Sequence, residues 1–204
     1  MNNNPTKTFT NENINFLLDP SNSKWHVPVW VATKSSKGES CHMSLVDGQD
    51  FPMQIHLQAC NPDDWIKINP GQIGFYRVNY SPEMLQRLIP AIQTLESVDR
   101  LGLESDLFAL SSAGSTTTNN FLDLMKGYKD ETDYTVWSNI DQNLSGLGVI
   151  LQNTDQYEDF KKFLLKLYKP LGDKLGWEAA EGECMSQKQF FKSISWFSSH
   201  FMSF

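Results

Sequence analysis

The spacing of apolar residues changes once between Asp64 and Gly114, and this change constrains the fold more than any other feature of the sequence. Before Tyr80 the side chains alternate with a period of two, in a short run from Trp65 to Ile68 and a second run from Ile73 to Tyr80. Asn69-Pro70-Gly71 separates the runs and is typical of a turn, since Pro fixes φ and Gly accepts a positive φ. Two alternating runs around such a turn predict a β-hairpin.

After Tyr80 the spacing becomes helical. Ser81-Pro82-Glu83 supplies a capping hydroxyl, a proline suited to the first helical position, and an acidic residue at the positive end of a helix. Apolar residues then recur at helical spacing in two successive helices, at Leu85, Leu88 and Ile92 and at Leu103, Leu107, Leu110 and Ala113, with Gly114 as the C-terminal stop. We therefore place a boundary between a β unit and an α unit at Tyr80–Ser81.

Several runs carry a resemblance to a known family: GFYRVNYS at Gly74–Ser81, VDRLGLESDLFALSSAG at Val98–Gly114, YTVWS at Tyr134–Ser138, PLGDKLGW at Pro170–Trp177 and, more loosely, WHVP at Trp25–Pro28. Their order and spacing resemble the zinc aminopeptidases of the gluzincin clan, and most of all the puromycin-sensitive aminopeptidases. The resemblance covers roughly Thr8 to Glu183.

The resemblance implies an α+β chain, with a small antiparallel β-sandwich (the family's third domain) followed by an all-α, solenoid-like domain (its fourth). In the full-length family, zinc hydrolyses peptides at their N-terminal end, and the helical domain closes over the active site. The chemistry lies in a domain that would precede residue 1.

The sequence itself lacks the motifs of that chemistry. A gluzincin needs H-E-x-x-H, in which two histidines on one helical face hold zinc and the glutamate acts as general base. None of the four histidines, His26, His42, His56 and His200, is followed by Glu, and the family's G-A-M-E-N motif is missing. G-x-S-x-G, Walker and G-x-G-x-x-G motifs are also missing, and Gly71 to Gly74 indicates a turn rather than a phosphate loop. We expect no catalytic, cofactor-binding or metal-binding residue in this chain, and no activity from it alone.

Composition excludes other classes of function. The net charge of −7 without a cluster of Lys and Arg argues against nucleic acid as a partner. No apolar run approaches the ~20 residues that span a bilayer, and no signal-peptide pattern begins the chain. Three cysteines, Cys41, Cys60 and Cys184, fit no disulfide framework, which favours free thiols in the cytoplasm. A zinc site from Cys41, His42, His56 and Cys60 is a minor alternative, because two distant pairs would have to converge.

Two charged positions have a functional and a structural interpretation. Arg77 is a candidate ligand contact, but pairing with a carboxylate or a carbonyl at the junction is favoured. Asp99-Arg100 is typical of a charge pair at a helix start and is interpreted as structural.

The remaining segments extend the two units. Strands are expected at Trp25–Thr33, Cys41–Val46 and Phe51–Leu57, with Pro28 marking an edge strand or a strand start, whereas 1–23 shows little pattern. Three further helices are expected, with the stripes Phe121, Leu124, Met125 and Tyr128; Tyr134, Val136, Trp137, Ile140 and Leu144; and Tyr157, Phe160, Leu164, Leu167 and Leu171. Gly146 and Gly148 weaken the second of these, and Pro170 is expected to kink or end the third.

The domain organisation expected is therefore 1–80 as a β-sandwich, 81–183 as a truncated helical domain and 184–204 as a divergent tail. The tail is rich in Ser and Phe and is expected to attach loosely and to promote self-association through uncovered apolar faces. Two functions remain open: the non-catalytic C-terminal portion of a zinc aminopeptidase, or a stand-alone protein-interaction module derived from one.

Overall fold

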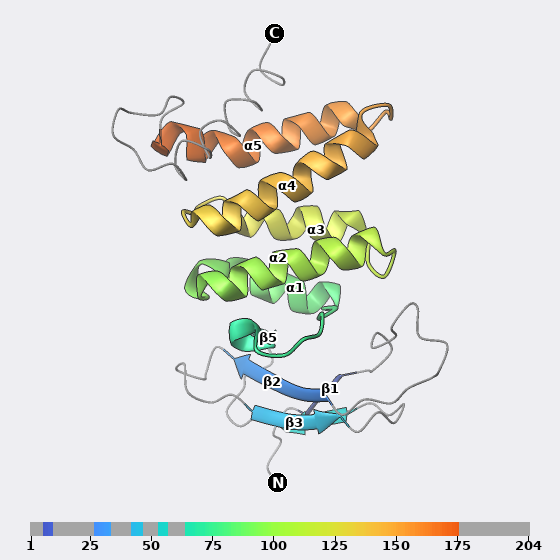
Figure 1. The fold of residues 1–204 in the computed structure, drawn as a ribbon, viewed down its shortest axis with the longest axis vertical. Helices are drawn as coiled ribbons and strands as arrows, with labels where there is room; N and C mark the ends of the chain where they lie inside the picture. Colours follow the sequence, from blue (N-terminus) through green and yellow to red (C-terminus); the bar gives the residue numbers. More distant parts are fainter. Residues whose placement is uncertain (1–5, 10–26, 34–41, 47–52, 57–63, 176–204) are drawn as a thin grey trace.

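The computed structural model describes residues 6–9, 27–33, 42–46, 53–56 and 64–175. Strands occupy the first part of the chain and helices the second, so the α+β fold class is confirmed. Figure 1 shows the helices stacked in layers on one side of the strands, with α1 and α2 nearest to them and α5 farthest away. The predicted tail from Cys184 to Phe204 lies outside the described residues.

In the part of the chain that the structure describes, five strands form two small antiparallel sheets. One pairs β1 (Thr6–Phe9) with β4 (Met53–His56), and the other has the order β3-β2-β5, from β3 (His42–Val46), β2 (Val27–Thr33) and β5 (Ile66–Ile68). Within the described residues, the strands predicted at Trp25–Thr33, Cys41–Val46, Phe51–Leu57 and Trp65–Ile68 are confirmed. Strand β1 was missed, because its four residues TKTF offer too short an alternation to stand out.

Pro28 lies near the start of β2, which is the central strand and not an edge. The edge interpretation is therefore wrong and the strand-start interpretation holds. β5 pairs with Val31–Thr33 of β2, so among the described strands Pro28 has only its β3 neighbour. A residue without an N–H is tolerated at such a position.

The predicted hairpin is wrong in its second half. The turn exists: Pro70–Gln72 forms a single 3₁₀ turn in which Gly71 has a φ of 71°. The segment Ile73–Tyr80 that follows forms no strand, and β5 pairs instead with β2. Its alternation is nevertheless real, because Ile73, Phe75 and Arg77 are exposed while Val78 and Tyr80 are buried against the helices. An extended segment lying on a helical core gives the same period of two as a strand.

Eight helical segments follow up to Leu175, the last described residue. They are α1 (Pro82–Leu88), the 3₁₀ segment Ile89–Thr94, α2 (Ser97–Ser112), α3 (Thr118–Met125), the 3₁₀ segment Lys126–Tyr128, α4 (Tyr134–Leu151) and α5 (Tyr157–Leu175), together with the turn Pro70–Gln72. The predicted cap of α1 is confirmed, since the Ser81 side chain accepts from the Met84 N–H. Asp133 caps α4 in the same way, and Gly114 ends the α2 region with a φ of 74°.

One apolar core runs through the helical stack. Every apolar stripe expected from helical spacing contributes to it, except that Leu110 is only partly buried and Ala113 lies exposed just beyond the end of α2. Its largest fully buried members include Trp137, Tyr128 and Phe121. Tyr134 and Tyr157 pack at its margin.

Two expected weak points do not interrupt the helices. α4 continues through Gly146 and Gly148 to Leu151, and α5 continues through Pro170 to Leu175. Of the two outcomes expected at Pro170, the end of the helix is therefore wrong, whereas the kink stays a prediction. Leu167, Tyr168 and Leu171 flank the proline on the buried side, and this packing stabilises the helix across it.

Candidate functional site

The junction between β5 and α2 holds a group of buried charges. Lys67 of β5 is 2% exposed, and its Nζ lies 3.3 Å from Asp99 Oδ1 in the first turn of α2. The same Nζ donates to the carbonyl oxygens of Ile68 at 2.8 Å and Asn69 at 3.3 Å. Burial lowers the pKa of Lys67, and the charge of Asp99 opposes that change. The buried ammonium of Lys67 therefore has three acceptors within the fold, the Asp99 carboxylate and two backbone carbonyls, and its charge is compensated there.

Asp99 and Arg100 do not pair with each other. Asp99 turns toward the sheet, where it also accepts the Gly71 N–H at 2.8 Å. Arg100 turns away from the sheet and binds Glu131 with two hydrogen bonds, Nη2–Oε1 at 2.9 Å and Nε–Oε2 at 2.5 Å. The structural interpretation of both residues is confirmed, but the expected local pair is wrong, because successive helical positions point in different directions.

Arg77 pairs as the favoured interpretation predicts. Its Nη1 donates to the Ser105 carbonyl at 3.0 Å and to Asp106 Oδ1 at 3.2 Å. The second oxygen of Asp106 accepts the Val78 N–H at 3.1 Å. Burial raises the pKa of Asp106, and this N–H and the Arg77 guanidinium oppose the rise. The hydrogen bond that a partner strand would have offered to Val78 comes from a helix side chain.

Tyr80 fixes the other end of this extended segment. Its hydroxyl accepts the Ile68 N–H at 2.9 Å and donates to the Ile68 carbonyl at 3.3 Å. Its ring is 4% exposed, and burial raises the pKa of the hydroxyl. The side chain therefore takes the place of a neighbouring strand for β5.

A second polar group lies deeper in the stack, between α2 and α4. Glu104 is fully buried, and its two carboxylate oxygens accept from Asn143 Nδ2 at 2.6 Å and from Asn139 Nδ2. Burial raises the pKa of Glu104 to about 7, although the two amide donors act in the opposite direction. This group was not predicted from the sequence, since Glu104 stands within an apolar stripe and its partners are 35 and 39 residues away.

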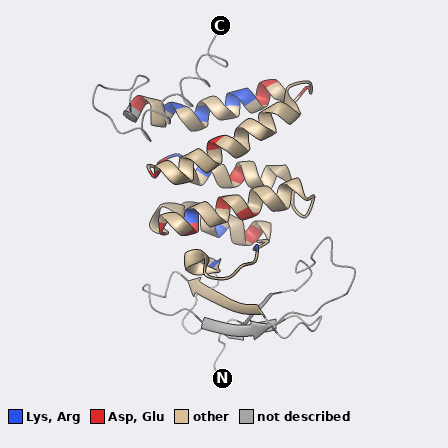
Figure 2. Ribbon diagram, viewed as in Figure 1, with Lys and Arg blue, Asp and Glu red and all other residues tan. Residues whose placement is uncertain are grey.

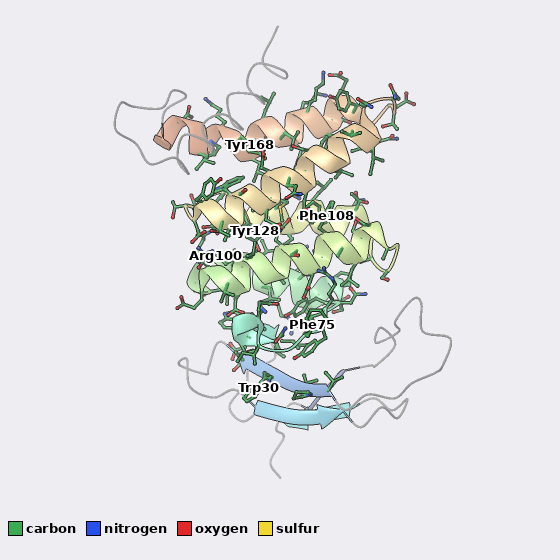
Figure 3. The ribbon with its side chains drawn as sticks, in the orientation of Figure 1. Trp30, Phe75, Arg100, Phe108, Tyr128 and Tyr168 are labelled. Carbon is green, nitrogen blue, oxygen red and sulfur yellow. The ribbon has the colours of Figure 1, made fainter. Side chains whose placement is uncertain are left out.

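A third polar group joins α2 to the start of α4. Glu131 is 1% exposed and, besides Arg100, accepts the N–H groups of Thr132 and Asp133 at 2.8 Å each. The Trp137 indole donates to the Glu131 carbonyl at 2.9 Å, and the Tyr128 hydroxyl donates to the Arg100 carbonyl at 2.6 Å. Figure 3 shows Arg100 and Tyr128 side by side between these helices.

These buried carboxylates are poorly suited to a metal. Their oxygens already accept from Lys67, Arg77 and Arg100, from asparagine amides or from backbone N–H groups. Among the described residues no group of three or more His, Cys, Asp and Glu side chains is placed to hold a metal ion. Zinc, which the resemblance implies for the full-length family and not for this chain, therefore does not fit the residues that the structure describes.

The alternative zinc site cannot be placed. Cys41 and Cys60 lie outside the described residues, and His42 and His56 belong to strands of different sheets whose side chains are not described. None of the helices in the described ranges is long and apolar enough to cross a membrane. Figure 2 shows basic and acidic positions interspersed along the helices, α5 among them.

The chain is similar to known proteins over most of its length. A family model described as the ERAP1-like C-terminal domain matches residues 65–200. That match continues past Glu183, where the resemblance seen in the sequence was expected to end, and includes most of the segment set apart as a tail.

Curated relatives give the same result. The chain is 33% identical over 180 residues to puromycin-sensitive aminopeptidase of Caenorhabditis elegans. The aligned residues make up 86% of this chain and 19% of the relative. It is 34% identical over 165 residues to aminopeptidase M1-A of Oryza sativa (78% of this chain, 19% of the relative) and 38% identical over 179 residues to aminopeptidase M1 of Arabidopsis thaliana (80% and 20%). The chain thus spans about a fifth of the length of these relatives.

Proposed function

The chain belongs to the ERAP1-like C-terminal domain family, and from this membership we propose that it is the non-catalytic C-terminal portion of a puromycin-sensitive-aminopeptidase-like zinc metallopeptidase. In this proposal the whole enzyme removes N-terminal residues from peptides. The zinc and the groups that hold the peptide's amino terminus belong to the part of the enzyme that this chain does not match. The chain itself contributes the helical stack.

The proposal that this chain is non-catalytic is supported by its buried charged side chains, which bind other parts of the fold. Lys67, Asp99, Arg100, Glu104 and Glu131 each bind a partner in a neighbouring segment, and together they connect the sheet to α2 and α2 to α4. A side chain whose donors or acceptors are already occupied inside the fold is not free to bind substrate. These groups therefore support a scaffold role.

The test is to purify the 204-residue chain and a chimera. In the chimera, the segment of the Caenorhabditis elegans relative that aligns with this chain is replaced by the corresponding residues of this chain. We expect the isolated chain to hold no stoichiometric zinc by metal analysis and to leave aminoacyl-arylamides uncleaved, whereas the chimera binds zinc and cleaves them. Chelator-sensitive turnover by the isolated chain, or an inactive but folded chimera, contradicts the proposal.

We also propose a cytoplasmic location, which is supported by three cysteines that fit no disulfide framework. Fractionation of cells that produce the tagged chain tests this, and recovery with secreted proteins contradicts it.

A further inference from the structure

The last two described helices are connected to the earlier ones mainly through α2. α4 packs against α2 and against α5, and Figure 1 shows it lying between α5 and the pair formed by α2 and α3. α5 in turn packs on α4. A change in the contact between α2 and α4 therefore acts on both helices at this end of the stack.

The middle of the α2–α4 contact is polar. Glu104 lies midway along α2, and Asn139 and Asn143 lie one turn apart in α4. Asn143 Nδ2 donates to Glu104 Oε1 at 2.6 Å, and Asn139 Nδ2 donates to Glu104 Oε2. Glu104 is 0% exposed, so both oxygens of this carboxylate depend on α4 for their hydrogen bonds.

The titratable groups that face Glu104 do not neutralise it. Arg100, one turn earlier on α2, is bound to Glu131. The other facing groups are the hydroxyls of Tyr128, in the 3₁₀ segment before α4, and of Tyr168 in α5, which donates to Asp141. Burial raises the pKa of both hydroxyls, and the negative charge of Glu104 adds to the rise. These two groups therefore stay neutral beside it.

Charged side chains from the other elements around α2 are paired elsewhere. These pairs are Asp99 with Lys67, Asp106 with Arg77, and Asp123 with Lys126. An ionised Glu104 is thus a buried negative charge that is stabilised by neutral amides alone, which is costly in an apolar interior.

The protonated carboxyl fits the same place. It has one O–H donor and one acceptor oxygen, and an asparagine amide presents either Oδ1 or Nδ2 according to how it is turned. One of the two asparagines then accepts from Glu104 while the other donates to it. Burial raises the pKa of Glu104 to about 7, although the two amide donors oppose the rise, so this carboxyl changes its charge close to neutral pH.

We infer that the α2–α4 contact is a pH-sensitive joint, closed when Glu104 is protonated and loosened when Glu104 is ionised. Loosening releases α4 and α5 together, because α5 packs on α4, whereas α1 and α2 both remain packed on α3. In the opened joint water reaches the carboxylate, and its ionised form is no longer penalised. Opening of one part of a helical stack without the rest is the behaviour of structures held together by nearest neighbours.

The experiment measures native-state hydrogen exchange of the 204-residue chain at pH 5 and pH 8 without denaturant. Exchange of α4 and α5 amides is divided by exchange of α1 and α3 amides in the same molecule. The pH dependence of the exchange chemistry is common to all amides, so it cancels in this ratio. Glu104→Gln keeps the size and the hydrogen-bonding groups of the protonated acid and carries no charge. Glu158→Gln, which removes a carboxylate that is 68% exposed on α5, is the control.

In the parent we expect the ratio to rise on the order of fiftyfold from pH 5 to pH 8, since the pKa of Glu104 is about 7 in the closed joint and returns toward 4.5 when the joint opens. In Glu104→Gln the ratio should be the same at both pH values and equal to that of the parent at pH 5. Glu158→Gln should follow the parent.

Three results overturn the inference. The first is a ratio in the parent that does not change with pH, and the second is the same rise in Glu104→Gln. The third is exchange that becomes faster at pH 8 in all helices alike, because Glu104 would then act on the stability of the whole fold and not on one contact. The first and third are read from the parent alone, so the test does not depend on the folding of the variant.

Discussion

Single buried charges in this molecule are stabilising only together with their partners. Arg100 and Glu131 illustrate this, since the side chain of Glu131 is 0% exposed and that of Arg100 13%. Removing one partner of a buried pair leaves the other charge buried without a partner, which is strongly destabilising. Replacing both partners by apolar residues changes the stability much less. An ion pair on the surface, such as that between Lys126 and Asp123, is screened by water.

We therefore predict that Arg100→Leu lowers the free energy of unfolding by about 3–5 kcal/mol. Lys126→Ala, which breaks a pair whose members are 64% and 42% exposed, should change it by less than about 1 kcal/mol. Urea unfolding at pH 7 measures both. Similar losses for the two variants would mean that the Arg100–Glu131 pair is not desolvated in solution.

Glu104 gives the molecule a dependence on pH. Its folded pKa of about 7 is above the usual value of 4.5, so the fold favours the protonated carboxyl. The stability contributed by that form is fully present below about pH 4.5 and is lost as the pH rises to about 7, by up to roughly 3 kcal/mol. Glu104→Gln carries no charge at any pH and should be more stable than the parent at pH 8 but not at pH 5.

Urea unfolding of both proteins at pH 5 and pH 8 measures this difference. Asp130→Asn, which removes a carboxylate that is 67% exposed, is the control and should follow the parent at both pH values. A stability difference between Glu104→Gln and the parent that does not change with pH contradicts the prediction.

The elements themselves differ in how tightly their glycines are packed. A Cβ at Gly127, in the 3₁₀ segment before α4, would lie 2.8 Å from the Ile89 carbonyl oxygen and 2.4 Å from Ile92 Cδ1. At Gly146, within α4, a Cβ would meet nothing within 4 Å. Backbone atoms cannot move aside as a side-chain end can, so of these two glycines Gly127 is the one that packing requires.

Gly127→Ala should accordingly destabilise the protein by about 1–3 kcal/mol. Gly146→Ala should stabilise it by about 0.5–1 kcal/mol, because Ala is the better helix former. Thermal and urea unfolding of the two variants decide the matter. Opposite signs are expected, and a stabilising Gly127→Ala would show that the segments are farther apart than described.

The elements also show what sequence can and cannot predict. A helix with a cap, such as α1 with Ser81, and a helix with a long apolar stripe, such as α5 with Leu164, were predicted because these determinants are local. The strand at Ile73–Tyr80 was wrongly predicted because alternation reports which side is buried but not what supplies the hydrogen bonds. Here Asp106 supplies the bond to Val78.

The polar groups of the candidate site were hardest to predict, because their partners are far apart in sequence. Arg77 was expected to find a carboxylate, but nothing local identifies Asp106 as that partner. Glu104 has no sequence signature at all, since asparagines at positions 139 and 143 acquire meaning only when α4 packs on α2.

At the scale of the whole molecule, the helices form a stack in which position determines local stability. The division of the chain into a β unit, a helical unit and a tail at Tyr80–Ser81 and Glu183 remains a prediction. Within the described residues, Val78 and Tyr80 already belong to the core of the helices that follow them. Val78 and Tyr80 therefore connect the extended segment Ile73–Tyr80 to the helical stack.

Stacked helices are stabilised by their nearest neighbours, so a helix with neighbours on both sides opens less readily than one with a neighbour on one side. α2 packs against α3 and α4, and the Lys67–Asp99 pair connects it to β5. Among the described helices α5 lies at the end of the stack on α4. Its contacts with α4 include the Tyr168–Asp141 hydrogen bond and the contact between the Trp137 and Tyr168 rings. We predict that amides of α5 exchange with solvent deuterium through a lower-energy opening than amides of α2. Tyr168→Phe, which removes the hydrogen bond to Asp141, should speed exchange in α5 and leave α2 unchanged. Native-state hydrogen exchange measured across a urea series provides the readout, and one common opening energy for both helices would mean that the stack unfolds only as a unit.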